Sequence, residues 1–177
     1  KYCASSPFIF MSTNKVYGDS PNKLNITEKK TRWELKTKDK YYKGIKEDFS
    51  IDNSTHSFFG VSKTYADLIV QEYGKNVGLK TVCFRGGCIT GPNHSGAKLH
   101  GFLSYLVKIS LSKKIYSLIG YKGKQVRDNL HSFDLVNSFW EYFKKPTRGE
   151  VYNIGGGRYS NCSIIEALDL VENIANI

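Results

Sequence analysis

Three glycines lie where a chain could bind phosphate. Gly155, Gly156 and Gly157 follow a predicted strand and precede a predicted helix, which is the position of the glycines in phosphate-binding turns. The match to a dinucleotide fingerprint is poor, because Ser160 occupies the place of the third glycine and no further strand follows to supply an acidic residue for a ribose. No other G-x-G-x-x-G sequence occurs. The glycines therefore favour a tight turn.

The cysteines and histidines do not form a metal-binding pattern. Cys88, His94 and His100 are spaced six residues apart, which fits no zinc site, so we predict no metal ion. No pair of cysteines forms a C-x-x-C motif or a dense disulfide frame, which favours a reducing compartment, and we expect the cytoplasm. The cysteines stand at positions 3, 83, 88 and 162.

The elements that must position any site alternate between strands and helices. Residues 7–12 form a nearly continuous apolar run, as expected of a strand buried on both faces. Apolar residues then recur with helical spacing from residue 57 to the glycines at 74 and 78. Residues 80–85 read as a second buried strand that ends at two glycines. This order predicts a βαβ unit, a parallel sheet and the α/β class.

The rest of the chain is less regular. Residues 21–56 form a long polar insertion with strand-like residues at 31–35, a length typical of a lid or binding loop. Asp134 is placed to cap a helix. Further helices are predicted at 102–109, 135–143 and 163–174, and strands at 115–119, 125–131 and 151–154.

Composition bounds the class of protein. The 177 residues are 40% hydrophobic and 14% aromatic, which excludes a disordered chain and is enough for one good core or two thin ones. The net charge of +10 favours an anionic partner. The basic residues are scattered, however, and no nucleic-acid-binding motif occurs, so we predict no nucleic-acid partner. No apolar run reaches 18 residues, so we predict no membrane partner either.

Three segments together resemble one family. They are residues 10–18 (FMSTNKVYG), 59–63 (FGVSK) and 123–128 (GKQVRD). In this order they resemble the extended short-chain dehydrogenase/reductase superfamily of nucleotide-sugar epimerases and dehydratases. The amino-acid sequences of these segments, followed by YNIGG at 152–156, look most like those of the CDP-paratose 2-epimerases (tyvelose epimerases).

The resemblance implies a redox reaction with NAD as cofactor. Such enzymes oxidise a sugar carbinol with bound NAD⁺ and return the hydride to the other face of the ketone. A Ser or Thr at a strand end steadies the oxygen, and a Tyr assisted by a Lys four residues later on the same helix face takes the proton. Thr13 and Lys63 occupy two of these catalytic positions, and Phe59 stands in the position of the Tyr.

Phe59 departs from the family pattern in a way that matters. A phenyl ring exchanges no proton, and loss of a general base typically costs about 10²–10⁴-fold in rate. Three interpretations stay open: another group acts, the subgroup catalyses a different redox reaction with a displaced base, or the protein binds nucleotide and sugar without efficient catalysis. The replacement candidates are Lys63, His56, Cys88, Tyr41 and Tyr42.

The resemblance also assigns binding residues. Arg127 is the strongest substrate candidate, because a planar guanidinium matches two oxygens of a diphosphate. Residues 85–96 match the loop that passes the nicotinamide and enters the sugar pocket. The expected cofactor-binding residues are Ser12, Lys63, Arg85 and Cys88. The expected substrate-binding residues are Asn14, Lys15, Cys88, Asn93 and Arg127.

The domain organisation follows from the same resemblance. Residues 1–89 and 128–156 are expected to form the C-terminal part of an incomplete Rossmann-type NAD-binding domain, and residues 90–127 and 157–177 a small α+β domain that binds the nucleotide sugar. The family's Gly-rich N-terminal half is not found here, so the chain reads as a fragment that is inactive alone. The implied substrate is a CDP-hexose used in polysaccharide biosynthesis. The implied assembly is a homodimer or homotetramer that uses the helix over 57–76.

Overall fold

The chain folds into two compact units, each assembled from separated segments. A computed structural model describes residues 5–98 and 100–177, so Cys3 lies outside the described residues. The first unit contains the described residues up to Leu24, with Gly44–Gly87 and Phe133–Ile154. The second contains Asn25–Lys43, Cys88–Ser132 and Gly155–Ile177.

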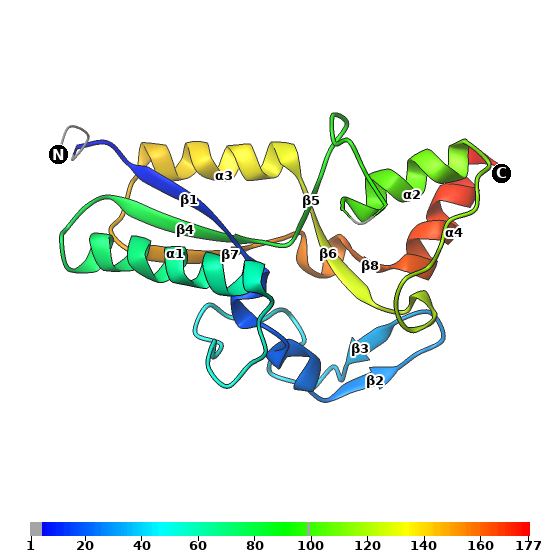
Figure 1. The fold of residues 1–177 in the computed structure, drawn as a ribbon, viewed down its shortest axis with the longest axis horizontal. Coiled ribbons are helices and arrows are strands. Elements are labelled where there is room, and N and C mark those ends of the chain that lie inside the picture. The colour runs from blue at the N-terminus through cyan, green and yellow to red at the C-terminus, as the bar shows by residue number, and fades with distance from the viewer. Residues whose placement is uncertain (1–4, 99) are drawn as a thin grey trace. The chain divides into compact units, whose positions relative to one another are not determined.

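The first unit is a parallel sheet between two helices. Its strands are β1 (Phe8–Thr13), β4 (Thr81–Gly86) and β7 (Glu150–Ile154), in the order β1-β4-β7 with both pairs parallel. The helices α1 (Phe58–Lys75) and α3 (Ser132–Lys144) lie on opposite sides of this sheet (Figure 1). The predicted βαβ unit, the parallel sheet and the α/β class are confirmed.

The central strand β4 divides its side chains between two different layers. Val82 and Phe84 pack with Tyr142 of α3 in an apolar core. Successive side chains of a strand point to opposite faces, so Cys83 and Arg85 face α1, where the Cys83 thiol donates to the carbonyl oxygen of Asp67 at 3.4 Å. Burial raises the pKa of Cys83 to about 12. The sheet thus has one apolar face and one polar buried face.

The second unit has its own sheet and core. Strand β5 (Cys88–Thr90) pairs parallel with β6 (Val126–His131), and β8 (Asn161–Ser163) pairs antiparallel with β6. Helices α2 (Phe102–Leu111) and α4 (Ile164–Ala175) enclose a small apolar core. Ser163 starts α4 with a capping box, because its hydroxyl accepts from the Glu166 N–H while the Glu166 carboxylate accepts from the Ser163 N–H. The core residues are Leu106, Ile164 and Ala167.

The polar insertion is divided between the units. Residues 25–43 belong to the second unit and contain the antiparallel hairpin of β2 (Ile26–Glu28) and β3 (Trp33–Leu35). The insertion as a whole was expected in the first domain. An ion pair explains the placement of the hairpin, since Glu34 receives two hydrogen bonds from Arg158 at 2.7 and 2.9 Å. Arg158 also lies over the Tyr42 ring.

Two local predictions are wrong. Residues 115–119 form no strand, because among the described residues no strand lies beside them to pair with their backbone. Helix α3 begins at Ser132, so Asp134 lies in its first turn instead of capping it; a carboxylate there still favours the helix N-terminus. The predicted turn at the glycines 155–157 is present, and it leads into a short 3₁₀ helix and β8 before α4 begins. The 3₁₀ helices are Asn14–Tyr17 (η1), Ser20–Lys23 (η2), Tyr121–Gly123 (η3) and Gly157–Tyr159 (η4).

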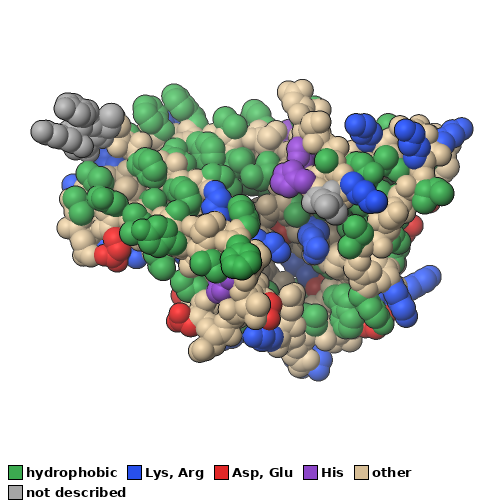
Figure 2. All heavy atoms as spheres, in the orientation of Figure 1, with side chains coloured by type: hydrophobic (Ala, Val, Ile, Leu, Met, Phe, Trp, Pro, Cys, Tyr) green, Lys and Arg blue, Asp and Glu red, His purple; other side chains and the backbone are tan. Residues whose placement is uncertain are grey.

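Large hydrophobic side chains remain exposed on the helices of the first unit. Figure 2 shows hydrophobic side chains gathered over this unit. No helix within the described ranges is long and apolar enough to span a lipid bilayer. On α1 the exposed residues include Phe58, Val61, Tyr65, Leu68 and Tyr73, and on α3 they include Phe133, Val136, Trp140 and Phe143.

Candidate active site

Thr13 ends β1 and begins the next turn. Its backbone is still extended, with φ −149° and ψ 153°, and its side-chain oxygen accepts the N–H of Lys15 at 3.2 Å. The residue therefore acts as the N-cap of η1. Its half-buried hydroxyl lies at the carboxyl end of a parallel strand, which is the edge where ligands bind in open α/β sheets.

Lys63 reaches the same strand end from α1. Its ammonium nitrogen donates to the Met11 carbonyl oxygen at 3.1 Å, two residues before Thr13. The nitrogen also lies 5.0 Å from the centre of the Phe10 ring and 6.0 Å from that of Phe59, distances at which an aromatic ring attracts a cation. One of the three ammonium donors is thus used by the protein, and the others are available to a ligand.

A glycine lets the first turn of α1 lie close to η1. A Cβ atom at Gly60 would stand 3.0 Å from the Lys15 carbonyl oxygen, closer than side chains normally approach backbone. Ser57 caps the helix by accepting the Gly60 N–H at 3.1 Å. The turn that carries Phe59 is therefore fixed against the turn that follows Thr13.

Phe59 leaves the site without the expected phenol. Its ring is 54% exposed and lies one helical turn before Lys63. His56 is not placed to replace it, because its two ring nitrogens face the carbonyl oxygens of Ser54 and Val16 at 3.0 and 2.8 Å. Of the candidates to replace the base, Lys63 is the one that shares a strand end with Thr13.

Ser12 and Arg85 use their side chains inside the protein. Ser12 is 4% exposed, and its hydroxyl donates to Asp67 Oδ2 at 2.5 Å. Arg85 donates from Nε and Nη2 to the two oxygens of Asp67, at 3.1 and 2.9 Å, and from Nη1 to the Tyr17 hydroxyl at 2.9 Å. Burial alone lowers the pKa of Arg85, but the bonds to Asp67 and Tyr17 outweigh it and raise that pKa. Any cofactor contact from Ser12 must use its backbone.

These side chains belong to a larger buried cluster that the sequence analysis missed. The Tyr17 hydroxyl donates to Asn153 Oδ1 at 2.7 Å, which links β7 to the same group. We call this cluster the Asp67 network. A signal was present in the sequence, since each strand of the first unit's parallel sheet carries a polar residue one position before its end. The members of the network are Ser12, Tyr17, Asp67, Arg85 and Asn153.

The substrate candidates of the second unit lie on β6 and nearby loops. Arg127 is exposed on β6, and its Nη1 donates to the neighbouring Val126 carbonyl oxygen at 3.2 Å. The next residue, Asp128, turns inward and accepts the Gly157 N–H at 2.9 Å; desolvation raises its pKa. A side chain at Gly155 would collide with this carboxylate. The glycines at 155–157 therefore serve a turn held by Asp128.

The remaining candidates occupy separate positions. Asn14 and Lys15 are exposed on η1 in the first unit. Cys88 starts β5 beside Asn129, and Asn93 is exposed in the turn closed by the bond from the His94 N–H to the Gly91 carbonyl. The second unit thus contains Cys88, Asn93 and Arg127, and the first contains the other predicted site residues.

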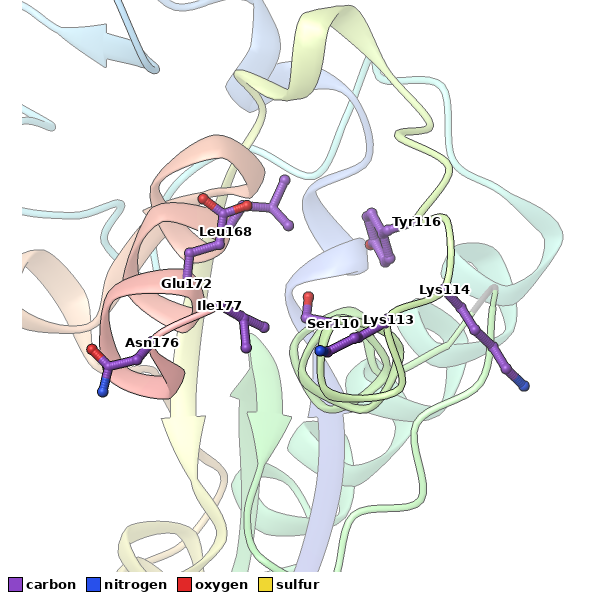
Figure 3. A pocket seen from close by; sticks show the side chains of 8 residues that line it. All are labelled: Ser110, Lys113, Lys114, Tyr116, Leu168, Glu172, Asn176 and Ile177. Atoms are coloured by element: carbon purple, nitrogen blue, oxygen red, sulfur yellow. The ribbon is translucent and has the colours of Figure 1, made fainter.

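One pocket of the second unit contains none of these candidates. It has a volume of about 480 Å³ and lies between the ends of α2 and α4 (Figure 3). Lysine, glutamate and apolar side chains line it, so it has no consistent charge or polarity. The lining residues are Ser110, Lys113, Lys114, Tyr116, Leu168, Glu172, Asn176 and Ile177.

Comparisons with known proteins point to one family. Residues 1–155 match the model of the NAD dependent epimerase/dehydratase family. The CDP-paratose 2-epimerase of Salmonella typhi is 32% identical over 100% of this chain and 52% of its own length. A dTDP-glucose 4,6-dehydratase of Escherichia coli is 29% identical over 84% of this chain and 37% of its own. The chain thus spans about half or less of these relatives.

Solved structures agree with the sequence relatives. The dTDP-glucose 4,6-dehydratase of Bacillus anthracis, solved with NAD, superimposes with a TM-score of 0.72 at 25% identity, over 96% of this chain and 46% of that one. The UDP-glucuronic acid 4-epimerase of Bacillus cereus, also solved with NAD, gives 0.69 at 26% identity, over 97% and 47%. The sheet of the first unit is therefore of the Rossmann type.

Proposed function

The chain belongs to the NAD-dependent epimerase/dehydratase family, and on that premise we propose that the full-length protein is a nucleotide-sugar 2-epimerase acting on a CDP-hexose. The family uses NAD as its cofactor. The 32% identity to a CDP-paratose 2-epimerase over the whole chain supports the choice of sugar nucleotide and of carbon. A role in polysaccharide biosynthesis is part of this proposal.

The residues at the end of β1 fit a redox step at a carbinol. NAD, when bound there, would supply the acceptor for the hydride of the carbinol carbon and the donor for its return to the opposite face. The Thr13 hydroxyl is placed to hydrogen-bond the reacting oxygen as its bond to carbon becomes a carbonyl. The Lys63 ammonium donates to the Met11 carbonyl, two residues before Thr13, and has donors left for the ribose hydroxyls of the cofactor, so the residues present fit this group.

The proton of the carbinol needs an acceptor other than Phe59. We assign this role to the Lys63 amine, which first releases its own proton to solvent, because it lies at the strand end that carries Thr13. A neutral amine that gains this proton becomes the ammonium that stabilises the oxygen when the hydride returns. The carbinol thus loses a hydride and a proton to form the ketone, and it regains both in the second half of the reaction.

The other predicted residues divide between cofactor and substrate. The first unit supplies the cofactor contacts, from Lys63 and the backbone of Ser12. In the second unit we assign Arg127 to the diphosphate, because its guanidinium is exposed and can present two parallel donors. By resemblance to the family we also assign Cys88 and Asn93 of the second unit to substrate binding, and likewise Asn14 and Lys15 of the first.

The observation that carries the proposal is the contact of Lys63 with the Met11 carbonyl, beside Thr13. The test incubates the full-length protein with CDP-paratose and follows inversion at C2 by NMR. Lys63→Met should abolish turnover, whereas Lys75→Met, an exposed lysine on the same helix, should not.

Other outcomes would assign a different function. Turnover of UDP- or dTDP-sugars without turnover of CDP-sugars would make the protein a 4-epimerase, dehydratase or reductase of the same family. Tight binding of CDP-sugars with no turnover would favour a non-catalytic nucleotide-sugar-binding protein, the function that Phe59 favours among the alternatives.

A further inference from the structure

Three polar side chains form a row across the parallel sheet, one position before its strands end. In the register of the sheet Ser12 of β1 lies beside Arg85 of β4, and Arg85 lies beside Asn153 of β7. Register partners in a sheet present their side chains to the same face. All three therefore point to the face covered by α1, directly below the ends of the strands.

A single carboxylate accepts hydrogen bonds from two members of this row, Ser12 and Arg85. Asp67 is completely buried on α1, and its oxygens accept from Ser12 at 2.5 Å, from two nitrogens of Arg85 at 3.1 and 2.9 Å, and from Gln71 at 2.7 Å. The charge of Arg85 compensates that of the carboxylate, as a buried ion pair requires. The row thus reaches α1 through one residue.

The hydrogen bond between Asp67 and Ser12 lies close to both proposed catalytic residues, Lys63 and Thr13. Asp67 lies one helical turn after Lys63 on α1, and Ser12 immediately precedes Thr13 on β1. The bond between Asp67 and Ser12 therefore joins the helix that carries the ammonium to the strand that carries the hydroxyl. A change in this bond moves one group relative to the other.

We propose that Asp67, acting through Ser12, is a positioning residue that sets the geometry of Lys63 and Thr13. This inference rests on the proposed function. It distinguishes two bonds on the same carboxylate: the bond from Ser12 sets the site, while the bond from Gln71 lies within α1 and only stabilises the helix. A purely structural role predicts that the two bonds are equivalent.

The experiment compares Ser12→Ala with Gln71→Ala in the full-length protein, since each removes one hydrogen bond from Asp67. Ser12→Ala should lower kcat by about 10- to 100-fold, because small displacements of reacting groups have effects of this size, and should leave KM nearly unchanged. Gln71→Ala should leave kcat unchanged. We expect Gln71→Ala and Ser12→Ala to lower the melting temperature by similar amounts. Ser12→Cys, which keeps the volume with a weaker donor, should give an intermediate kcat.

A second measurement does not depend on turnover. Hydrogen exchange of residues 13–17 should be faster in Ser12→Ala than in the wild type, and unchanged in Gln71→Ala. If the wild type turns over no nucleotide sugar, the proposed function fails, and the exchange rates alone decide the positioning role. Equal effects of Ser12→Ala and Gln71→Ala on kcat and exchange would overturn the inference.

Discussion

At the scale of single residues, position 59 is where the proposed mechanism departs from the pattern of the family that the chain resembles. Its side chain is half-exposed and lies one turn before Lys63, with the ring 6.0 Å from the ammonium nitrogen. A hydroxyl added to this ring would place a phenol where the family has its base. The surroundings are open enough for the extra oxygen.

Phe59→Tyr should therefore raise the kcat of the full-length enzyme. A general base in the correct position contributes about 10²–10⁴-fold, so we expect an increase of at least about 10²-fold over an activity that depends on Lys63. The measurement is the initial rate of C2 inversion with CDP-paratose at saturating substrate.

Phe58→Tyr is the matched control for this prediction. It makes the same chemical change one residue earlier, on a side chain that is 97% exposed, and should leave the rate unchanged. Equal rates for Phe59→Tyr and the wild type would show that the base has been displaced to another part of the site.

At the scale of elements, α1 is held to the sheet by a glycine. A Cβ atom at Gly74 would lie 2.2 Å from the Gly149 nitrogen and 2.4 Å from the Thr81 hydroxyl. The helix can approach the start of β7 only because position 74 has no side chain.

Gly74→Ala should destabilise the protein despite its better helix propensity. The substitution gains about 1 kcal/mol of propensity, but overpacking against backbone costs roughly 1–3 kcal/mol or more, so we expect a net loss of unfolding free energy. Chemical denaturation measures it. Ser62→Ala, an exposed change on the same helix, should stay within about 0.5 kcal/mol of the wild type.

The hairpin β2–β3 should respond to acid through Glu34. The hydrogen bonds from Arg158 hold the pKa of Glu34 below its usual range. A lowered folded-state pKa gives stabilisation that is present above the unfolded-state pKa of about 4.3 and is lost as the pH falls through the lower folded value.

Glu34→Gln should therefore remove a pH-dependent part of the stability. We expect a loss of about 1 kcal/mol at neutral pH that shrinks as the pH falls below about 4, measured by urea unfolding between pH 3 and 7. Glu141→Gln, which breaks an exposed pair with Lys144, is the matched control and should change the stability at neutral pH by no more than about 0.5 kcal/mol. A loss for Glu34→Gln that is constant with pH would contradict the assignment.

The sequence predicted elements better than contacts. Periodicity placed α1, β1 and β4 within about a residue, because each buries apolar residues at the spacing of its own structure. The segment 115–119 was wrong because a strand needs a partner as well as apolar residues. The Asp67 network was missed because it depends on the register Ser12–Arg85–Asn153, which no single segment encodes. Lys63 and Thr13 were found through the resemblance to a family, and their roles stay a prediction.

At the scale of the whole molecule, the exposed side of α1 is the best candidate for a subunit interface. Val61, Tyr65, Leu68 and Tyr73 are all exposed on this one helix. An apolar helix face of this kind is typical of surfaces that another chain covers. We propose that a second copy of the full-length protein packs here.

Tyr65→Asp should shift the full-length protein to a smaller assembly, from homodimer to monomer or from homotetramer to a smaller oligomer. A charge at the centre of an apolar interface loses its hydration on assembly without gaining a partner. Light scattering after size-exclusion chromatography measures the mass. Tyr159→Asp makes the same change on a side chain that is 102% exposed in the second unit and should leave the mass unaltered. An unchanged mass for Tyr65→Asp would place the interface elsewhere.

The interleaved course of the chain has a consequence for its biosynthesis. The chain passes from one unit to the other after residues 24, 43, 87, 132 and 154, and among the described strands of the first sheet β7 is the last to leave the ribosome. Until then β4 has an unpaired edge in the nascent chain, a site at which polypeptides aggregate. We expect expression at low temperature, or with an overproduced ribosome-associated chaperone, to increase the yield of soluble protein.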